Sequence, residues 1–123
     1  MMNVIEEKSF AFAVNVVSTV KEMRRTQKEY ELTSQFVRSG TSIGANVSEA
    51  VKAQSKNDFI AKMSIASKEA NETRYWIRLL RETKYLDEAK GKELQAQAEE
   101  LIRILTSIIK TSQERKESKP RNS

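Results

Sequence analysis

The stretch RSGTSIGANVSEA, residues 38–50, combines two glycines with small polar side chains, a composition found in loops that bind phosphate. A phosphate-binding P-loop requires the pattern G-x-x-x-x-G-K-[ST] directly after a strand. Here the two glycines are one residue closer together, Ala45 and Asn46 follow in place of Lys and Ser or Thr, and no strand pattern precedes them. We therefore interpret the stretch as part of a helix.

The side chains that most often perform catalysis or bind metals are missing. The chain contains no His and no Cys, which excludes thiolate metal sites, Cys nucleophiles, disulfides and every Ser–His arrangement. Di-metal sites in helix bundles need Glu-x-x-His pairs, and Glu69 and Glu72 have no such partner. We predict a protein that is not an enzyme and that holds neither a metal nor a cofactor. An enzyme that uses Asp, Glu, Lys or Tyr is a less favoured alternative.

Basic side chains form two groups that could bind a polyanion. The first group is Lys21, Arg24, Arg25 and Lys28, and the second is Arg74, Arg78 and Arg81, at spacings i, i+4 and i+7, with Lys84 beyond them. Together with the net charge of +5, these groups favour RNA or DNA as a partner. Tyr75 could stack on a base. Two alternatives remain open: the arginines pair with Glu93, Glu99 and Glu100, or the protein is merely basic.

Four helices are expected to position these residues. Apolar side chains recur at steps of three and four over residues 5–25, from Thr33 to a turn near Gln54, over residues 56–83, and from Asp87 to residue 112. Thr33, Ser55 and Asp87 are suitable N-caps. The expected buried rows are Phe10, Ala13, Val14, Val17 and Val20; Phe36, Gly40, Ile43, Val47 and Ala50; Phe59, Met63, Ala66, Ala70, Thr73, Ile77 and Leu80; and Leu94, Ala98, Leu101, Leu105 and Ile108. Because the links are short, the sequence predicts an all-α, antiparallel up-down-up-down four-helix bundle.

The bundle is expected to be a single domain that covers residues 1–112. The polar basic tail, residues 113–123, contains no apolar side chain and is expected to be disordered. The acidic pair near the N-terminus does not fit a signal peptide, and no run approaches the roughly 18 apolar residues of a membrane span. These features favour a soluble cytoplasmic protein with no membrane partner.

Two parallel stripes run along the predicted second helix. Gly40, Gly44 and Ser48 form a bare stripe that would let a neighbouring helix approach closely. Arg38, Ser42, Asn46 and Glu49 form a polar row on another face. Arg38 and Glu49 are three turns apart, so each would need its own partner. One interpretation is that the row forms polar contacts with another helix, a subunit or a ligand. The alternative is that it is a flank exposed to solvent.

The third helix carries more apolar surface than one bundle core needs. Ile65, Trp76 and Leu79 lie in one sector beside its buried row. Apolar surface of this kind usually marks an interface, so these residues are predicted to form an oligomer contact. The alternative is that Trp76 covers the end of the bundle core.

Two segments resemble the four-helix-bundle family that is encoded in intervening sequences of bacterial 23S rRNA genes. The family pattern, approximately R-x-x-x-S-I-x-x-N-[IV]-x-E-[GA], is matched by Arg38, Ser42, Ile43, Asn46, Val47, Glu49 and Ala50, with Ala50 where Gly is common. A second, looser phrase of the type I-A-x-x-S/A-x-x-E falls on Ile65, Ala66, Ala70 and either Glu69 or Glu72. The similarity in layout covers about residues 5–112.

This resemblance implies a four-helix bundle that often assembles as a homopentamer and has no established enzymatic activity. A related branch comprises the accessory proteins of diversity-generating retroelements, which bind a reverse transcriptase and nucleic acid through a basic surface. We therefore expect a homo-oligomeric RNA- or DNA-binding accessory factor. The alternative is a protein-interaction scaffold, for example for a reverse transcriptase or a ribosome-related protein, whose basic surface is incidental.

Overall fold

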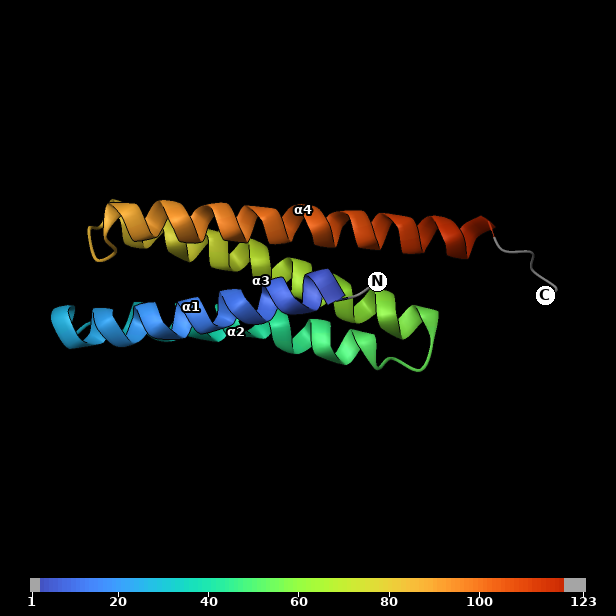
Figure 1. Ribbon diagram of the computed structural model, residues 1–123, viewed down its shortest axis with the longest axis horizontal. Helices are drawn as coiled ribbons and strands as arrows, with labels where there is room; N and C mark the ends of the chain where they lie inside the picture. The colour runs from blue at the N-terminus through green and yellow to red at the C-terminus, as the bar shows by residue number, and fades with distance from the viewer. Residues whose placement is uncertain (1–2, 119–123) are drawn as a thin grey trace.

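A computed structural model describes residues 3–118, which form four helices. They are α1 (Asn3–Gln27), α2 (Glu31–Val51), α3 (Lys56–Glu82) and α4 (Glu88–Ser118). Each helix runs antiparallel to the next and packs against it, and α4 returns to contact α1 (Figure 1). No strand occurs among the described residues. The predicted all-α four-helix bundle is confirmed.

The residues that α2, α3 and α4 bury are largely those that the apolar periodicity of the sequence predicts. All five residues predicted for the α2 row are buried, including Phe36, Ile43 and Val47. The predicted rows of α3 and α4 are buried as well, except for Phe59 and Ile108, which are half-buried at the edge of the core. These three helices each carry one dominant apolar row, and burial of that row drives the packing.

Helix α1 buries a different row from the predicted one. Phe10, Val14 and Val17 are 70%, 53% and 40% exposed, so the prediction that they face the core is wrong. Of that predicted row, Val20 is buried and Ala13 is half-buried. The buried side chains of α1 are instead Ile5, Phe12, Val16, Val20 and Met23, with Ser9 and Thr19 beside them. This helix has two apolar rows, and periodicity alone does not choose between them.

The contact with α2 explains the choice of row on α1. A methyl group at Gly40 would lie 3.0 Å from both methyl groups of Val16, and one at Gly44 would lie 3.3 Å from the carbonyl oxygen of Ser9. The predicted close approach of a helix is thus confirmed at these two glycines. It is wrong at Ser48, which is exposed. Each four-residue step drifts by about 40° around a helix, so Ser48 has turned away from α1.

The helix ends follow the predicted capping at two of three sites. The Ser55 hydroxyl accepts a hydrogen bond from the Asp58 amide at 3.0 Å, and the Asp87 carboxylate accepts one from the Lys90 amide at 2.9 Å. The prediction of Thr33 as a cap is wrong, because α2 begins at Glu31. The Glu29 carboxylate accepts hydrogen bonds from the amides of Leu32 and Thr33, each at 3.0 Å, and so supplies the cap from outside the helix.

The last helix is longer than expected. It continues to Ser118, so the prediction of disorder directly after Ser112 is wrong for residues 113–118. This segment contains Gln, Glu, Arg and Lys, which are good helix formers, and neither Gly nor Pro. Tail residues 119–123 lie outside the described residues. Among the described helices, none has the length and apolar character needed to cross a membrane.

The close contact at the glycines predicts that substitution by Leu strongly lowers stability at one position of the bare stripe and has little effect at another. Gly40→Leu should lower the free energy of unfolding by at least about 2 kcal/mol, because the side chain has no space beside Val16 and must push α1 away. Ser48→Leu is the matched control and should change stability by no more than about 0.5 kcal/mol. Urea unfolding followed by circular dichroism measures both. Equal effects would show that α1 does not depend on the bare stripe.

Candidate functional site

The two basic groups lie at the same end of the bundle. Helices α1 and α3 run in the same direction and therefore end together, next to the starts of α2 and α4 (Figure 1). Four side chains there form no salt bridge with any described residue, and we call them the basic end: Lys21, Lys28, Arg78 and Lys84. All four are exposed. Their charges are therefore available to an external anion.

The neighbouring arginines are partly engaged within the bundle. Arg24 donates hydrogen bonds to the hydroxyls of Thr33 and Ser34, both at 3.0 Å, and lies 5.7 Å from the ring centre of Tyr30. Arg25 pairs with Glu22 at 2.6 Å, and this hydrogen bond holds the pKa of Glu22 below its ordinary value. Arg74 donates to the Asn71 side-chain oxygen at 2.9 Å. Neither Arg24 nor Arg74 forms a salt bridge with a carboxylate in the part of the chain that the structure describes.

Arg81 has a packing role in the bundle. Its guanidinium donates hydrogen bonds to Gln95 and Glu88 on α4, and its side chain is only 22% exposed. A methyl group at Gly91 would lie 2.6 Å from the Arg81 side chain, so α4 leaves space for this arginine. The expected pairing of an arginine with α4 is found here, although its partner is Glu88 and not Glu93, Glu99 or Glu100.

Two lysines of the basic end have left-handed backbone conformations. The φ angle is 55° at Lys28 and 67° at Lys84. At the end of α3, the amide of Lys84 bonds to the carbonyl of Arg81, and the amide of Tyr85 bonds to that of Leu80. This pair of hydrogen bonds is the Schellman motif, whose left-handed position usually holds Gly. A side chain at such a position costs about 1 kcal/mol.

The polar row of α2 reaches α3 through Arg38. The guanidinium contacts the Glu69 carboxylate at 3.3 Å and also bonds to Glu72. The Glu72 carboxylate accepts a further hydrogen bond from the Trp76 indole N–H at 3.2 Å. The Trp76 hydrogen bond, followed by that of Arg38, holds the pKa of Glu72 below its ordinary value. The bond to Glu72 is the largest cause of the raised pKa of Arg38.

The other members of the row serve two different purposes. Ser42 donates to the carbonyl of Arg38 at 2.6 Å, and Asn46 donates to that of Ser42 at 2.9 Å, so both bond within α2. Glu49 pairs with Lys62 of α3 at 3.0 Å, and this hydrogen bond raises the pKa of Lys62. Arg38 and Glu49 each have a separate partner, as their spacing requires. The row joins α2 to α3 at its two ends.

The predicted apolar stripe of α3 is divided between core and surface. Ile65 is 41% exposed, and Leu79 is half-buried. Trp76 packs against the core cluster, as the covering interpretation requires, and its ring meets that of Tyr75 edge-on at 5.2 Å. Tyr75 is 57% exposed. Ile65 and Tyr75 therefore leave apolar surface uncovered on this helix.

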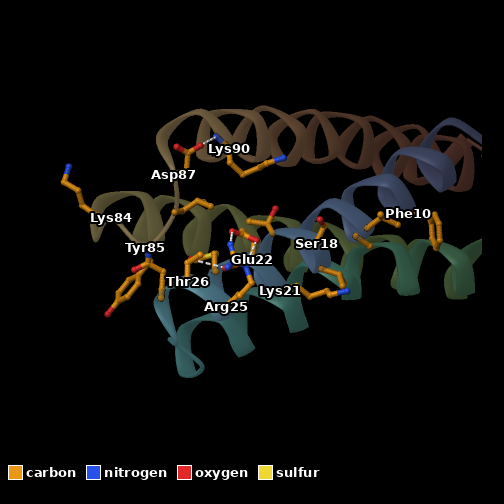
Figure 2. A pocket seen from close by; sticks show the side chains of 17 residues that line it. Phe10, Ser18, Lys21, Glu22, Arg25, Thr26, Lys84, Tyr85, Asp87 and Lys90 are labelled. Carbon is orange, nitrogen blue, oxygen red and sulfur yellow. Dashed lines mark hydrogen bonds and ion pairs between the residues drawn. The ribbon is translucent and has the colours of Figure 1, made fainter.

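An open groove of about 1230 Å³ lies between α1, the α3–α4 link and the start of α4. We call it the α1–α4 groove. Phe10, Ala13, Val14 and Val17 of α1 give it an apolar side, and Tyr85 and Leu86 line the end near the link. Figure 2 shows Lys21 and Lys90 beside this surface and Lys84 pointing outward from the link. The apolar row that α1 fails to bury is thus one side of a groove.

The comparisons with known proteins identify the family. The 23S rRNA-intervening sequence protein family matches residues 2–107. The chain belongs to this family. A crystal structure of a protein of unknown function from the S23 ribosomal protein family of Bacteroides thetaiotaomicron is 46% identical, with a TM-score of 0.84, and the alignment covers 86% of this chain and 98% of that one. Curated proteins give no match.

The surfaces of this 23S rRNA-intervening sequence protein were only partly predictable. The matched region contains the basic end, the α1–α4 groove and the Arg38 network, by which we mean Arg38, Glu69, Glu72 and Trp76. The groove was missed, although the row Phe10, Val14, Val17 and Lys21 has the 4-3-4 spacing of a helix-packing seam. The left-handed lysines were also missed, since no glycine marks the end of either helix. The positions of the arginines gave no sign that Arg81 differs from Arg74 and Arg78.

The Arg38 network predicts a pH-dependent contribution to stability in this 23S rRNA-intervening sequence protein. The pKa of Glu72 is lower in the folded state than in the unfolded state. The stability that its ionised carboxylate contributes is therefore present at pH values above the unfolded pKa and is lost as the pH falls through the folded pKa. Glu72→Gln should reduce stability at pH 7 by up to about 1 kcal/mol, a value discounted because both partners are partly exposed. The variant should also lose less stability than the wild type between about pH 5 and pH 3.

Urea unfolding at these pH values measures the effect of Glu72→Gln. Glu82→Gln is the matched control, because it removes one charge from the same helix outside the network. A Glu72→Gln variant with the same loss of stability on acidification as the wild type would contradict the prediction.

Proposed function

We propose that this protein is a non-enzymatic cytoplasmic homo-oligomer that acts as an accessory factor by binding RNA or DNA at its basic end. The observation that carries the proposal is that α1 and α3 end at the same end of the bundle, which places Lys21, Lys28, Arg78 and Lys84 there without salt-bridge partners among the described residues. Arg24, Arg25 and Arg74 add to the positive field around them. Arg81 is left out of the site because α4 already holds its guanidinium.

The carboxylates around the basic end support this proposal. Glu22 is held by Arg25, Glu29 caps α2, and Glu88 is held by Arg81. These three acids are therefore occupied. Glu31 and Glu82 also lie at this end, but no described carboxylate forms a salt bridge with the four cations of the basic end. Phosphate groups are ligands of the appropriate charge, and binding through them depends weakly on sequence and steeply on salt.

The backbone at Lys28 and Lys84 adds a separate argument. Gly would be favoured at both positions because each has a positive φ. Lysine at both places therefore costs stability, and the cost is repeated at two helix ends on the same side of the bundle. A requirement for positive charge at this end of the bundle accounts for Lys instead of Gly at both positions, and it supports the proposed site.

The double variant Lys28→Gly, Lys84→Gly should separate binding from folding. Its free energy of unfolding should rise by about 1 kcal/mol per site, because Gly relieves the left-handed strain. Its affinity for a labelled RNA hairpin and a DNA duplex should fall, and the slope of log affinity against log salt should become shallower by about two. Lys52→Gly is the matched control at the opposite end of the bundle, and it should leave both the affinity and the slope unchanged.

Mobility-shift titrations at two salt concentrations, together with urea unfolding, measure these effects. Absence of wild-type binding at low salt would overturn the proposed nucleic-acid function. Unchanged binding by the more stable double variant would show that the basic end is not the site.

The proposed homo-oligomer is a homopentamer, as the family resemblance implies, with Ile65, Trp76 and Leu79 at its interface. Light scattering should then give a mass about five times the 14.1 kDa of one chain. Ile65→Asp should dissociate the assembly without unfolding the chain, because this side chain is 41% exposed in the isolated bundle. Val51→Asp, at an exposed apolar position outside the stripe, is the control. A wild-type mass of 14.1 kDa, or an Ile65→Asp variant of full mass, would contradict the assembly or its interface.

A further inference from the structure

We propose that the α1–α4 groove is a docking site for an amphipathic helix of a partner protein that carries acidic residues beside its apolar face. This inference does not depend on nucleic-acid binding, although two lysines of its rim, Lys21 and Lys84, also belong to the basic end.

The apolar side has the spacing of a helix-packing surface. Phe10, Val14 and Val17 are large, exposed and separated by steps of four and three residues, and Lys21 continues the row. Such a row packs against the apolar face of another helix, as in helix-in-groove recognition. Aromatic rings line this groove at Phe10 and Tyr85, whereas Val14 and Val17 between them are aliphatic and provide no stacking surface for bases. A continuous row of this kind fits a helix better than a nucleic acid.

The length of the groove also fits a helix. Its α1 side extends from Phe10 to Gln27, which corresponds to about 26 Å at the rise of an α-helix. A docked helix of about 18 residues would cover this length and reach Tyr85 and Leu86 at the α3–α4 link. It would bury the row of α1 that the fold leaves exposed.

The rim of the groove selects the charge of the partner. Lys21 and Lys84 form no salt bridge with any described residue. The rim carboxylates are occupied, because Glu22 pairs with Arg25 and Asp87 caps α4. Lys90 adds a third ammonium, which is shared with Glu93 and Asn15. The groove therefore combines an apolar side with an excess of positive charge, which complements an acidic helix.

A second copy of this chain fits the groove less well. Among the described residues, the exposed large apolar side chains outside α1 are Tyr30, Val51, Ile65 and Tyr75, and they do not form a continuous row on one helix. The predicted apolar stripe of α3 is exposed only at Ile65, because Trp76 and Leu79 are half-buried. A second copy therefore offers a comparable row of exposed large apolar side chains only from its own α1, whose exposed face carries the same lysines. A foreign helix with acidic flanks satisfies both the apolar and the charge requirements.

The test uses two fluorescent 18-residue helical peptides with Leu at the a and d heptad positions. One has Glu at the flanking e and g positions, and the other has Lys there. Fluorescence anisotropy with the assembled wild-type protein should show at least about tenfold tighter binding of the Glu peptide. The variant Val14→Ser, Val17→Ser should bind it at least about tenfold more weakly, and Ala11→Ser, at an exposed α1 position outside the groove, should bind it normally.

Reversal of the rim charge with Lys21→Glu and Lys84→Glu should make the Lys peptide the tighter ligand. The uncharged Val14→Ser, Val17→Ser variant should retain RNA and DNA binding, so failure of the docking site and failure of the basic end are distinguishable. Three results would overturn the proposal: no binding of the Glu peptide at about 100 μM, equal affinity for both peptides, or a fall in oligomer mass caused by Val14→Ser, Val17→Ser. The last result would assign the groove to a second copy of this chain.

Discussion

The close approach of α1 to α2 at Gly40 and Gly44 determines which surfaces this bundle presents. Two glycines in a helix cost roughly 2 kcal/mol of helix propensity, and the contacts of Val16 and Ser9 offset that cost only when the Phe12 side of α1 faces inward. The other apolar row of α1 must then face outward. One steric constraint therefore fixes both the composition of the core and the apolar side of the α1–α4 groove.

The up-down-up-down topology determines in a similar way where the basic residues lie. Helices α1 and α3 finish at the same end of the bundle, so basic residues separated by some fifty positions in the sequence lie at one end. A helix C-terminus also carries partial negative charge, which cations stabilise. This effect accounts for basic residues in a last helical turn. Lys28 and Lys84 lie just beyond the ends of α1 and α3, at positions whose left-handed backbone favours Gly.

The fold was largely predictable because α2, α3 and α4 each have one dominant apolar row, so periodicity and burial agree. Helix α1 has two such rows, and the choice between them depends on a tertiary contact with two glycines, which local pattern does not contain. The start of α2 was mispredicted for a similar reason, since Glu29 caps it from outside the helix. The candidate residues were recognisable by type and spacing. The residues that pair with them were not recognisable from the sequence. In the structure, these partners show that Arg81 packs against α4 and that Arg38 connects α2 to α3.

The Arg38 network places a physical condition on any assembly through α3. Arg38 faces Glu69 and Glu72, and the positive charge of Lys68 also acts on Glu72, so the four charges balance. Burial of unbalanced charge is costly, whereas a balanced and hydrogen-bonded cluster can lie at the edge of an interface. Because Glu72 also holds the indole N–H of Trp76, the cluster fixes the orientation of that ring against the core. A subunit that covers Ile65 and Leu79 would then meet a preformed surface, and little side-chain entropy at Trp76 would be lost on association.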